Sequence, residues 1–213
     1  GYGVVRSLRL SKFSVRIVGL DIYPDAVGRH WCDEFLQAPL TSSENYVDFL
    51  RDVVEKYSVD LVIPGIEQDA YRFAVDDCLR SQCNTQFAVN NPLLVKTSYD
   101  KWTMHLALQK AGFKTIKTAI DGEFPDLVNT LGLPMVLKPR ISYASKGLHV
   151  VDNDVDFFYF KKKMGAAFMA QEFVGDENSE YTLGAFGLGN GTSAGKITFL
   201  RKLSLEGSTS KAQ

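Results

Sequence analysis

The segment that decides the fold reads LPMVLKPRISYASKGLHVV and covers residues 133–151. An apolar run leads to Lys138, and a polar loop from Arg140 to Gly147 leads into a second apolar run. A lysine at the end of an apolar strand keeps its stem in the core and its ammonium at the rim, which suits a contact to phosphate. The small, polar loop can fold its backbone N–H groups over an anion. On this segment alone, an ordinary strand end followed by a hairpin stays open as the alternative.

The residues around this segment predict an α+β half with antiparallel pairing. Ser98 is expected to cap a helix over 99–111 that stops at Gly112. Two long strands are expected to form a hairpin through a glycine-rich turn at 189–195. The remaining expected elements are strands over 115–119, 134–139, 148–151, 168–174, 181–188 and 196–203, and helices over 124–131 and 154–164.

The first 95 residues predict a different class, a parallel α/β sheet covered on both faces. Helical spacing alternates there with short, continuous apolar runs, which is typical of strands buried on both sides. Asn91-Pro92 predicts a turn, and residues 207–210 are loop-like. The expected elements are helices over 4–10, 44–57 with a serine cap at Ser43, and 69–79, and strands over 15–23, 60–64 and 87–89.

The composition indicates a globular protein that acts on a small molecule. Apolar residues make up 45% of the 213 residues, charged residues 23%, and the net charge is -1. Such a charge gives no field to attract nucleic acid or an acidic membrane. The chain has no run approaching the roughly 18 apolar residues of a membrane span and no export signal. Its three cysteines, Cys32, Cys78 and Cys83, lack metal-type pairing, so we expect reduced thiols and a cytoplasmic location.

Two further segments carry residues suited to a nucleotide. Residues 170–182 read AQEFVGDENSEYT, an expected strand followed by an acidic loop. The strand end can offer backbone groups to an adenine edge, and Glu180 can accept hydrogen bonds from ribose hydroxyls. Residues 98–103 read SYDKWT and place Lys101 in a first helical turn. Taken singly, the acidic run is a solvated turn and Lys101 a surface lysine.

In this order and spacing, the three segments resemble the ATP-grasp superfamily, and more closely its branch around the large subunit of carbamoyl phosphate synthetase and biotin carboxylase. Members have an Asp-Lys pair opening a helix before a glycine step, matched by Asp100-Lys101 and residues 111–115. They have a strand lysine before a mobile loop of small residues, matched by residues 134–147. Their hinge, followed by a glutamate, is matched by residues 171–174 and Glu180.

The resemblance implies an α/β chain of two domains. Residues 1–95 are similar to the Rossmann-like, parallel α/β pre-ATP-grasp domain, with a glycine-rich first turn at 1–3 and a substrate-side loop at 63–67. Residues 96–213 correspond to an incomplete ATP-grasp α+β domain. Its lid lobe covers about 113–174, and its C-terminal lobe begins in 175–213.

The resemblance also implies a nucleotide sandwiched between two lobes. The phosphates would meet two lysines and the closing loop, adenine would meet the hinge, and ribose would meet the glutamate after it. The implied cofactor-binding residues are Lys101, Lys138, Ser142, Ser145, Lys146, Gly147, Gln171, Glu172, Phe173, Val174 and Glu180. Arg201 and Lys202 lie where relatives place basic groups near the γ-phosphate or the acyl phosphate, which implies a catalytic role.

The implied activity is that of an ATP-dependent carboxylate–amine or related ligase that acts through an acyl phosphate. A small-molecule carboxylate and an amine would be its substrates, and the resemblance allows a homodimer. The superfamily's magnesium ligands have no counterpart before Gln213. We therefore expect ATP and Mg²⁺ as cofactors, no metal ligand within the chain, magnesium ligands beyond residue 213, and no catalysis by this fragment alone.

Two other classes of function stay open on the sequence. One is a non-catalytic ATP-binding module, which the presence or absence of a Glu-x-Asn step beyond residue 213 would decide. The other is an NAD(P)-dependent dehydrogenase, because Gly1 and Gly3 before a helix and Asp21 after the next strand mimic half of a dinucleotide fingerprint. That fingerprint explains nothing after residue 95.

Overall fold

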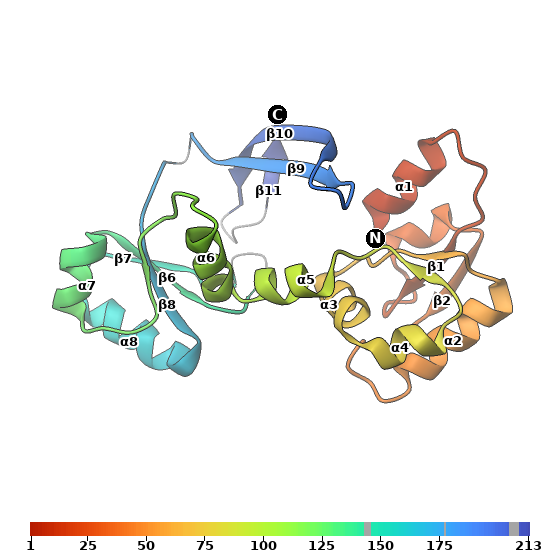
Figure 1. Ribbon diagram of the computed structural model, residues 1–213, viewed down its shortest axis with the longest axis horizontal. Coiled ribbons are helices and arrows are strands. Elements are labelled where there is room, and N and C mark those ends of the chain that lie inside the picture. Colours follow the sequence, from red (N-terminus) through yellow and green to blue (C-terminus); the bar gives the residue numbers. More distant parts are fainter. Residues whose placement is uncertain (143–145, 177, 205–208) are drawn as a thin grey trace. The chain divides into compact units, whose positions relative to one another are not determined.

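The computed structural model describes residues 1–142, 146–176, 178–204 and 209–213 and divides the chain into two compact units (Figure 1). Unit 1 comprises residues 1–99 and unit 2 residues 100–213. Among the described residues, no helix combines the length and the apolar run that crossing a membrane needs. The three cysteines, all in unit 1, are free thiols.

Unit 1 is built on short parallel strand pairs, as the predicted class requires. Strand β1 pairs with β2 and β3 with β4, both parallel. Apolar side chains of α2, α3 and α4 form its core, including Leu50 (1% exposed), Phe73 (2%) and Leu79 (0%). Its elements are α1 (Tyr2–Leu10), β1 (Val18–Asp21), η1 (Val27–Trp31), β2 (Glu34–Gln37), α2 (Tyr46–Tyr57), β3 (Leu61–Val62), α3 (Glu67–Val75), α4 (Asp77–Gln82), β4 (Gln86–Phe87) and α5 (Pro92–Tyr99).

Unit 2 contains two antiparallel sheets, as predicted for the second half of the chain. One has the strand order β5-β8-β6-β7 and the other β11-β10-β9. Helices α7 and α8 run beside the first sheet (Figure 1). The elements are α6 (Lys101–Lys110), β5 (Thr118–Ala119), α7 (Phe124–Leu131), β6 (Met135–Pro139), β7 (His149–Val151), α8 (Asp154–Met164), η2 (Gly165–Ala167), β8 (Phe168–Glu172), β9 (Tyr181–Gly187), β10 (Ser193–Leu203) and β11 (Thr209–Ala212).

The core of unit 2 forms between the four-stranded sheet and these two helices. It consists of Leu127, Leu131, Met135, Leu137, Val151, Phe157, Phe168 and Ala170. The ring of Phe157 (0% exposed) lies 5.2 Å from that of Phe124 and 5.9 Å from that of Phe168, centroid to centroid. Helices α7 and α8 begin and end where the sequence predicts: Gly132 and Gly165 follow their last residues, and Asn153 caps α8 by accepting from Asp156 N (2.9 Å).

Two predicted helices are each broken by an aspartate that caps the following helix. The helix expected over 69–79 divides at Asp76, whose carboxylate accepts from Leu79 N (3.0 Å). The helix expected over 99–111 with Ser98 as its cap is wrong: α5 ends at Tyr99, and Asp100 caps α6 by accepting from Trp102 N (2.9 Å). An aspartate side chain competes with the backbone for hydrogen bonds, so it favours a cap over a helix interior. Helix α6 stops at Gly112 as predicted, where φ is 79°.

Other predictions fail because local signals are weak. The expected turn at Asn91-Pro92 begins α5, since proline is tolerated in a first helical turn. Helix α2 begins at Tyr46 without a side-chain cap, so Ser43 does not cap it. Strand β3 is short, and Leu61 is 46% exposed, which is not the fully buried strand predicted. Part of the segment expected to be loop-like is β11, which pairs with β10.

We expect Phe157→Ala to lower the free energy of unfolding of unit 2 by about 3 to 5 kcal/mol, because a large cavity would remain between α8 and the sheet. Val155→Ala, on the same helix but 73% exposed, is the matched control and should change it by less than about 0.5 kcal/mol. Urea denaturation followed by circular dichroism measures both variants. Equal midpoints for the two would contradict this description of the core.

Candidate functional site

The alternation of side chains along β6 places Lys138 on the face of the sheet opposite the core. Met135 and Leu137, both 0% exposed, belong to the core cluster with α7 and α8. Successive residues of a strand point to opposite faces, so Val136 and Lys138 lie on the other side. Lys138 is next to the last residue of the strand, directly before the loop that the sequence predicts to bind an anion.

The ammonium of Lys138 has a fixed neutral partner. Its Nζ donates to Oε1 of Gln171 on the neighbouring strand β8 (2.7 Å), and Nε2 of Gln171 donates to Oγ1 of Thr118 on β5 (2.9 Å). Burial, and secondly the positive charge of Lys101, lower the pKa of Lys138. A cation that is partly desolvated and lies beside a second cation is stabilised by an arriving anion. This face of the sheet is therefore suited to a phosphate.

Lys101, the second predicted phosphate ligand, lies at the stem of the loop. Its Nζ donates to the carbonyl oxygens of Pro139 (3.5 Å), Arg140 (3.3 Å) and Ser142 (2.8 Å), and to Ser142 Oγ (3.0 Å). The backbone N–H of Lys101 also donates to Arg140 O (3.0 Å). The structure thus brings Lys101, Lys138 and Ser142 together, and Lys101 binds the carbonyl groups that lead out of β6.

An ion pair holds α6 against the end of β6. Arg140 donates from Nη2 to Asp100 Oδ2 (2.5 Å) and from Nε to Asp100 Oδ1 (3.2 Å), a two-point contact that fixes both orientations. Hydrogen bonding from Arg140 is the main reason that the pKa of Asp100 lies below its ordinary value. Because Asp100 also caps α6, the pair places Lys101 beside Lys138.

The far end of the loop returns close to its beginning. Gly147 has φ of 76°, and a Cβ there would lie 3.0 Å from Cγ of Pro139, so a side chain would clash with the strand end. Lys146 is exposed. Residues 143–145, which include the predicted ligand Ser145 and half of the predicted mobile loop 142–147, lie outside the described residues.

The predicted adenine hinge begins where β8 ends. The sequence predicts that the strand runs to Val174, but it ends at Glu172. Glu172 N donates to Lys117 O (3.1 Å), and this is the last backbone hydrogen bond of the strand to its neighbour. The Glu172 carboxylate accepts from Lys117 N (3.0 Å), which closes the edge of β5. Phe173 (46% exposed) and Val174 (57%) follow as an exposed apolar pair outside the sheet. Such a segment suits the apolar face and the edge of a purine.

Glu180 and Arg201 form a second cluster at the start of the β9–β10 hairpin. Their side chains make a short ion pair, and Arg201 N donates to Glu180 O (2.8 Å). Arg201 Nη1 donates to Thr209 Oγ1 (3.3 Å), whereas its Nε is buried without a partner among the described residues. Glu180 is partly buried and Tyr181 is 63% exposed, so the two side chains lie on different sides of the chain.

Lys202 is separated from this cluster by the geometry of β10. It is exposed, and it lies opposite Lys211 of β11 in the register. Since neighbouring strand residues face opposite sides, Arg201 and Lys202 do not serve the same site from one face of the sheet.

Sequence reasoning missed two residues of the Lys138 cluster. Arg140 follows the lysine in the deciding segment, so its place there was a usable signal. Thr118 had no such signal, because the sequence around a single threonine in a short strand does not indicate which residue its side chain contacts.

In unit 1, a polar cluster ties the predicted substrate-side loop to its neighbours. Asp69, in the first turn of α3, accepts from Thr41 Oγ1 (2.5 Å) and from Tyr46 OH (2.9 Å). Burial, and secondly the charge of Asp69, raise the pKa of Tyr46. These contacts fix the first turn of α3, whose first residue, Glu67, is the last residue of the predicted loop 63–67.

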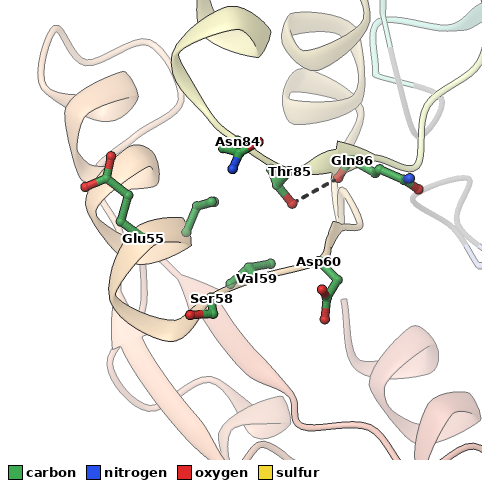
Figure 2. Close-up of a pocket in the computed structure, with 8 residues that line it drawn as sticks. Glu55, Ser58, Val59, Asp60, Asn84, Thr85 and Gln86 are labelled. Atoms are coloured by element: carbon green, nitrogen blue, oxygen red, sulfur yellow. Dashed lines mark hydrogen bonds between the residues drawn. The ribbon is translucent and has the colours of Figure 1, made fainter.

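A hollow of about 560 Å³ in unit 1 contains none of the predicted site residues. Figure 2 shows its polar lining, with Thr85 Oγ1 donating to Gln86 O (3.5 Å). Asp60 precedes β3 and Gln86 begins β4, so the hollow lies at the amino ends of the parallel strands. Ligands of open α/β sheets bind at the carboxyl ends. We assign no function to this hollow.

The part of the chain that the structure describes forms no metal site. Within the described ranges, no group of three or more His, Cys, Asp or Glu side chains could hold a metal ion. The magnesium ion that the resemblance implies has no ligand set there, and we derive no step through it.

Comparison with known proteins gives one family and a consistent group of structures. The family described as "PylC-like, N-terminal domain" matches residues 4–86. A formate-dependent phosphoribosylglycinamide formyltransferase of Parabacteroides distasonis is 23% identical over 155 residues, which are 70% of this chain and 37% of that protein.

Two solved structures share the fold over almost the whole chain. N5-carboxyaminoimidazole synthetase from Staphylococcus aureus, complexed with ADP, has a TM-score of 0.72 at 20% identity and covers 96% of this chain and 52% of its own. The biotin carboxylase domain of Hydrogenobacter thermophilus 2-oxoglutarate carboxylase, in complex with MgADP, ADP and bicarbonate, has a TM-score of 0.72 at 14% identity and covers 97% and 49%.

These matches confirm the resemblance to the ATP-grasp superfamily and its fold. They do not single out carbamoyl phosphate synthetase within it. The chain spans about half the length of these solved structures and less than two-fifths of the formyltransferase.

We expect Asp100→Asn to destabilise unit 2 by about 1 to 2 kcal/mol at neutral pH, because asparagine keeps the helix cap but loses the charged partner of Arg140. The folded pKa of Asp100 is lowered, so its contribution is present above the unfolded pKa and is lost as pH falls through the folded pKa. The difference from wild type should therefore shrink below roughly pH 4. Urea denaturation across pH measures it, with the exposed Asp121→Asn as control. A difference that does not change with pH would contradict the role of the ion pair.

Proposed function

We propose, since the chain has the ATP-grasp fold, that it forms the nucleotide-binding part of an ATP-dependent ligase that activates a carboxylate as an acyl phosphate. The comparisons give the fold at identities of 23% or less for the three proteins described above. The activity is inferred from the site. Its substrates would be a small carboxylate and an amine or similar nucleophile.

The observation that carries the proposal is the Lys138 ammonium, held beside a second lysine on the face of the four-stranded sheet opposite the core with α7 and α8. Lys138 is partly desolvated, and its pKa is lowered by burial and by Lys101. Two cations in such positions cost free energy until an anion neutralises them. The β-phosphate and γ-phosphate of ATP supply that charge, and the loop closed by Gly147 would cover them.

Adenine would bind at the exposed hinge. Phe173 and Val174 provide apolar contact, and their backbone lies outside the sheet. Glu180 would take the ribose, in which case one carboxylate oxygen stays with Arg201 and the other accepts from a hydroxyl. Arg201 would then reach toward the phosphates from the ribose side. The pairing of these two residues supports a shared task at one nucleotide.

The chemistry is phosphoryl transfer followed by acyl transfer. A carboxylate oxygen of the substrate attacks the γ-phosphorus, the bond to the β,γ-bridging oxygen breaks, and ADP leaves. The amine then attacks the acyl carbon, the bond to the phosphate oxygen breaks, and inorganic phosphate leaves with the proton passing to a base. Lys138, Lys101 and Arg201 contribute by holding the phosphates and by stabilising the charge that develops on them.

Several finer features remain part of this proposal. They are a specificity close to that of carbamoyl phosphate synthetase, the magnesium requirement, a homodimeric assembly and a cytoplasmic location. We also propose the domain limits at residues 95 and 96. The two relatives with solved structures bind ADP according to their descriptions, which supports the choice of nucleotide.

A non-catalytic ATP-binding module remains the second candidate, and the site in unit 2 fits it equally well. Release of ADP in the presence of one of a set of carboxylates, measured with the complete protein, separates the two. The dehydrogenase alternative is not favoured. It requires its glycines in a turn, whereas Gly3 lies inside α1.

We expect Lys138→Ala to weaken ADP binding by about 1 to 3 kcal/mol, because the phosphate loses a charged hydrogen bond. Isothermal titration calorimetry with ADP measures this change. Lys162→Ala, an exposed lysine of α8, is the matched control and should bind as wild type does. Equal affinities for wild type and Lys138→Ala would remove this lysine from the site.

We expect Arg201→Leu to weaken binding of a non-hydrolysable ATP analogue by about 1 to 3 kcal/mol and binding of ADP by much less, if Arg201 meets the γ-phosphate. Lys202→Leu, on the opposite side of β10, should change neither. The same calorimetry measures both ligands with both variants. Equal losses for the analogue and for ADP would assign Arg201 to the ribose side only.

A further inference from the structure

Three polar side chains from three adjacent strands line one face of the four-stranded sheet β5-β8-β6-β7. Thr118 of β5 lies opposite Gln171 of β8 in the register, and Gln171 lies opposite Val136 of β6. Lys138 is two residues further along β6 than Val136 and therefore shares its face. Thr118, Gln171 and Lys138 form a continuous chain of hydrogen bonds across these strands.

The direction of every hydrogen bond in this chain is determined. Lys138 has donors only, so it donates to Oε1 of Gln171 (2.7 Å). The Gln171 amide group then turns Nε2 toward Thr118 and donates to its Oγ1 (2.9 Å). The Thr118 hydroxyl donates its own hydrogen to Ile116 O (3.0 Å) and therefore accepts from Gln171. If the Gln171 amide were reversed, its N–H donors would face the N–H donors of the Lys138 ammonium, and no hydrogen bond could form between them.

From this geometry we propose that Thr118 is a positioning residue of the nucleotide site. Its hydroxyl holds the amide of Gln171 so that Oε1 always faces the Lys138 ammonium, which orients that ammonium before the nucleotide arrives. The inference rests on the function proposed above, because it takes Lys138 as a phosphate ligand. Thr118 itself does not touch the nucleotide.

A neutral acceptor orients Lys138 without cancelling its charge. A carboxylate at position 171 would pair with the ammonium and compete with phosphate, whereas an amide oxygen leaves the full positive charge for the ligand. Gln171 uses one of the three N–H groups of Lys138, so two others can meet phosphate oxygens. Met169 lies opposite Lys138 in the register and is 1% exposed, so a buried apolar side chain borders the lysine on this face of the sheet. Orientation before binding reduces the ordering that the ligand must otherwise cause.

The test uses two substitutions at position 118 and ADP as the ligand. Thr118→Val keeps the branched shape but removes the hydroxyl, so we expect ADP binding to weaken about three- to tenfold, the effect of one neutral hydrogen bond. Thr118→Ser restores the acceptor and should bind within about twofold of wild type. Thermal unfolding of each variant checks that the sheet is intact. Equal binding by Thr118→Val and wild type, or equal loss in both variants, would overturn the role of the hydroxyl.

The pH dependence of ADP binding separates positioning from packing. A hydrogen bond to the charged form of Lys138 raises its pKa, so loss of a well-placed acceptor lowers the pKa further. ADP affinity should therefore decline at a lower alkaline pH in Thr118→Val than in wild type and Thr118→Ser. An unchanged alkaline limb in Thr118→Val would count against the inference.

A double-mutant cycle with Gln171→Met completes the test. Methionine has no amide for Thr118 to hold, so Thr118→Val should cause no further loss of ADP affinity in that background. A loss equal to that in wild type would show that Thr118 acts by another route and would overturn the inference. A wild-type chain that binds no ADP would overturn the proposed function and this inference together. A wild type that binds ADP, with Thr118→Val unchanged, would overturn only the role of Thr118.

Discussion

The rest of the site depends on one constraint, the burial of alternate side chains of β6 beneath α7 and α8. Met135 and Leu137 are both 0% exposed, and complete burial of such a side chain contributes about 1.5 to 3 kcal/mol. A slip of the strand by one residue would expose both and would place Lys138 in the apolar core. The same force that holds the sheet to its helices therefore points the lysine to the opposite face of the sheet.

The polar contacts then convert this orientation into a site. The Asp100–Arg140 ion pair ties α6 to the strand end, and as a cap of α6 the same aspartate carries Lys101 to the carbonyl groups of the loop stem. Lys138 is instead held by a neutral amide. Lys101 is engaged with the protein oxygens of the loop stem, whereas Lys138 is hydrogen-bonded to a neutral amide, although the motif presents the two lysines alike.

The second cluster would constrain how the proposed nucleotide is held. Glu180 and Arg201 pair with each other, which joins two roles that the resemblance assigns to separate parts of the ligand. Arg201 Nε is buried without a partner among the described residues, and a buried donor of this kind is costly unless a ligand satisfies it. A ribose or phosphate oxygen at that position would relieve the cost and would explain why a partly buried arginine is placed there.

The sequence by itself determined the two classes of fold, the positions of α7 and α8, and the segment that ends in Lys138. Those features depend on apolar periodicity and on turn residues, and both are signals that lie within a short stretch of the sequence. The sequence misjudged the helices around Asp76 and Asp100, where a side chain competes with the backbone and the outcome depends on its partners. Only the tertiary structure decided that Lys101 binds the loop stem, that Glu180 meets Arg201, and that Thr118 completes the chain to Lys138. Those contacts join residues 21 to 53 positions apart in the chain, and they form only after strand register has fixed which side chains share a face.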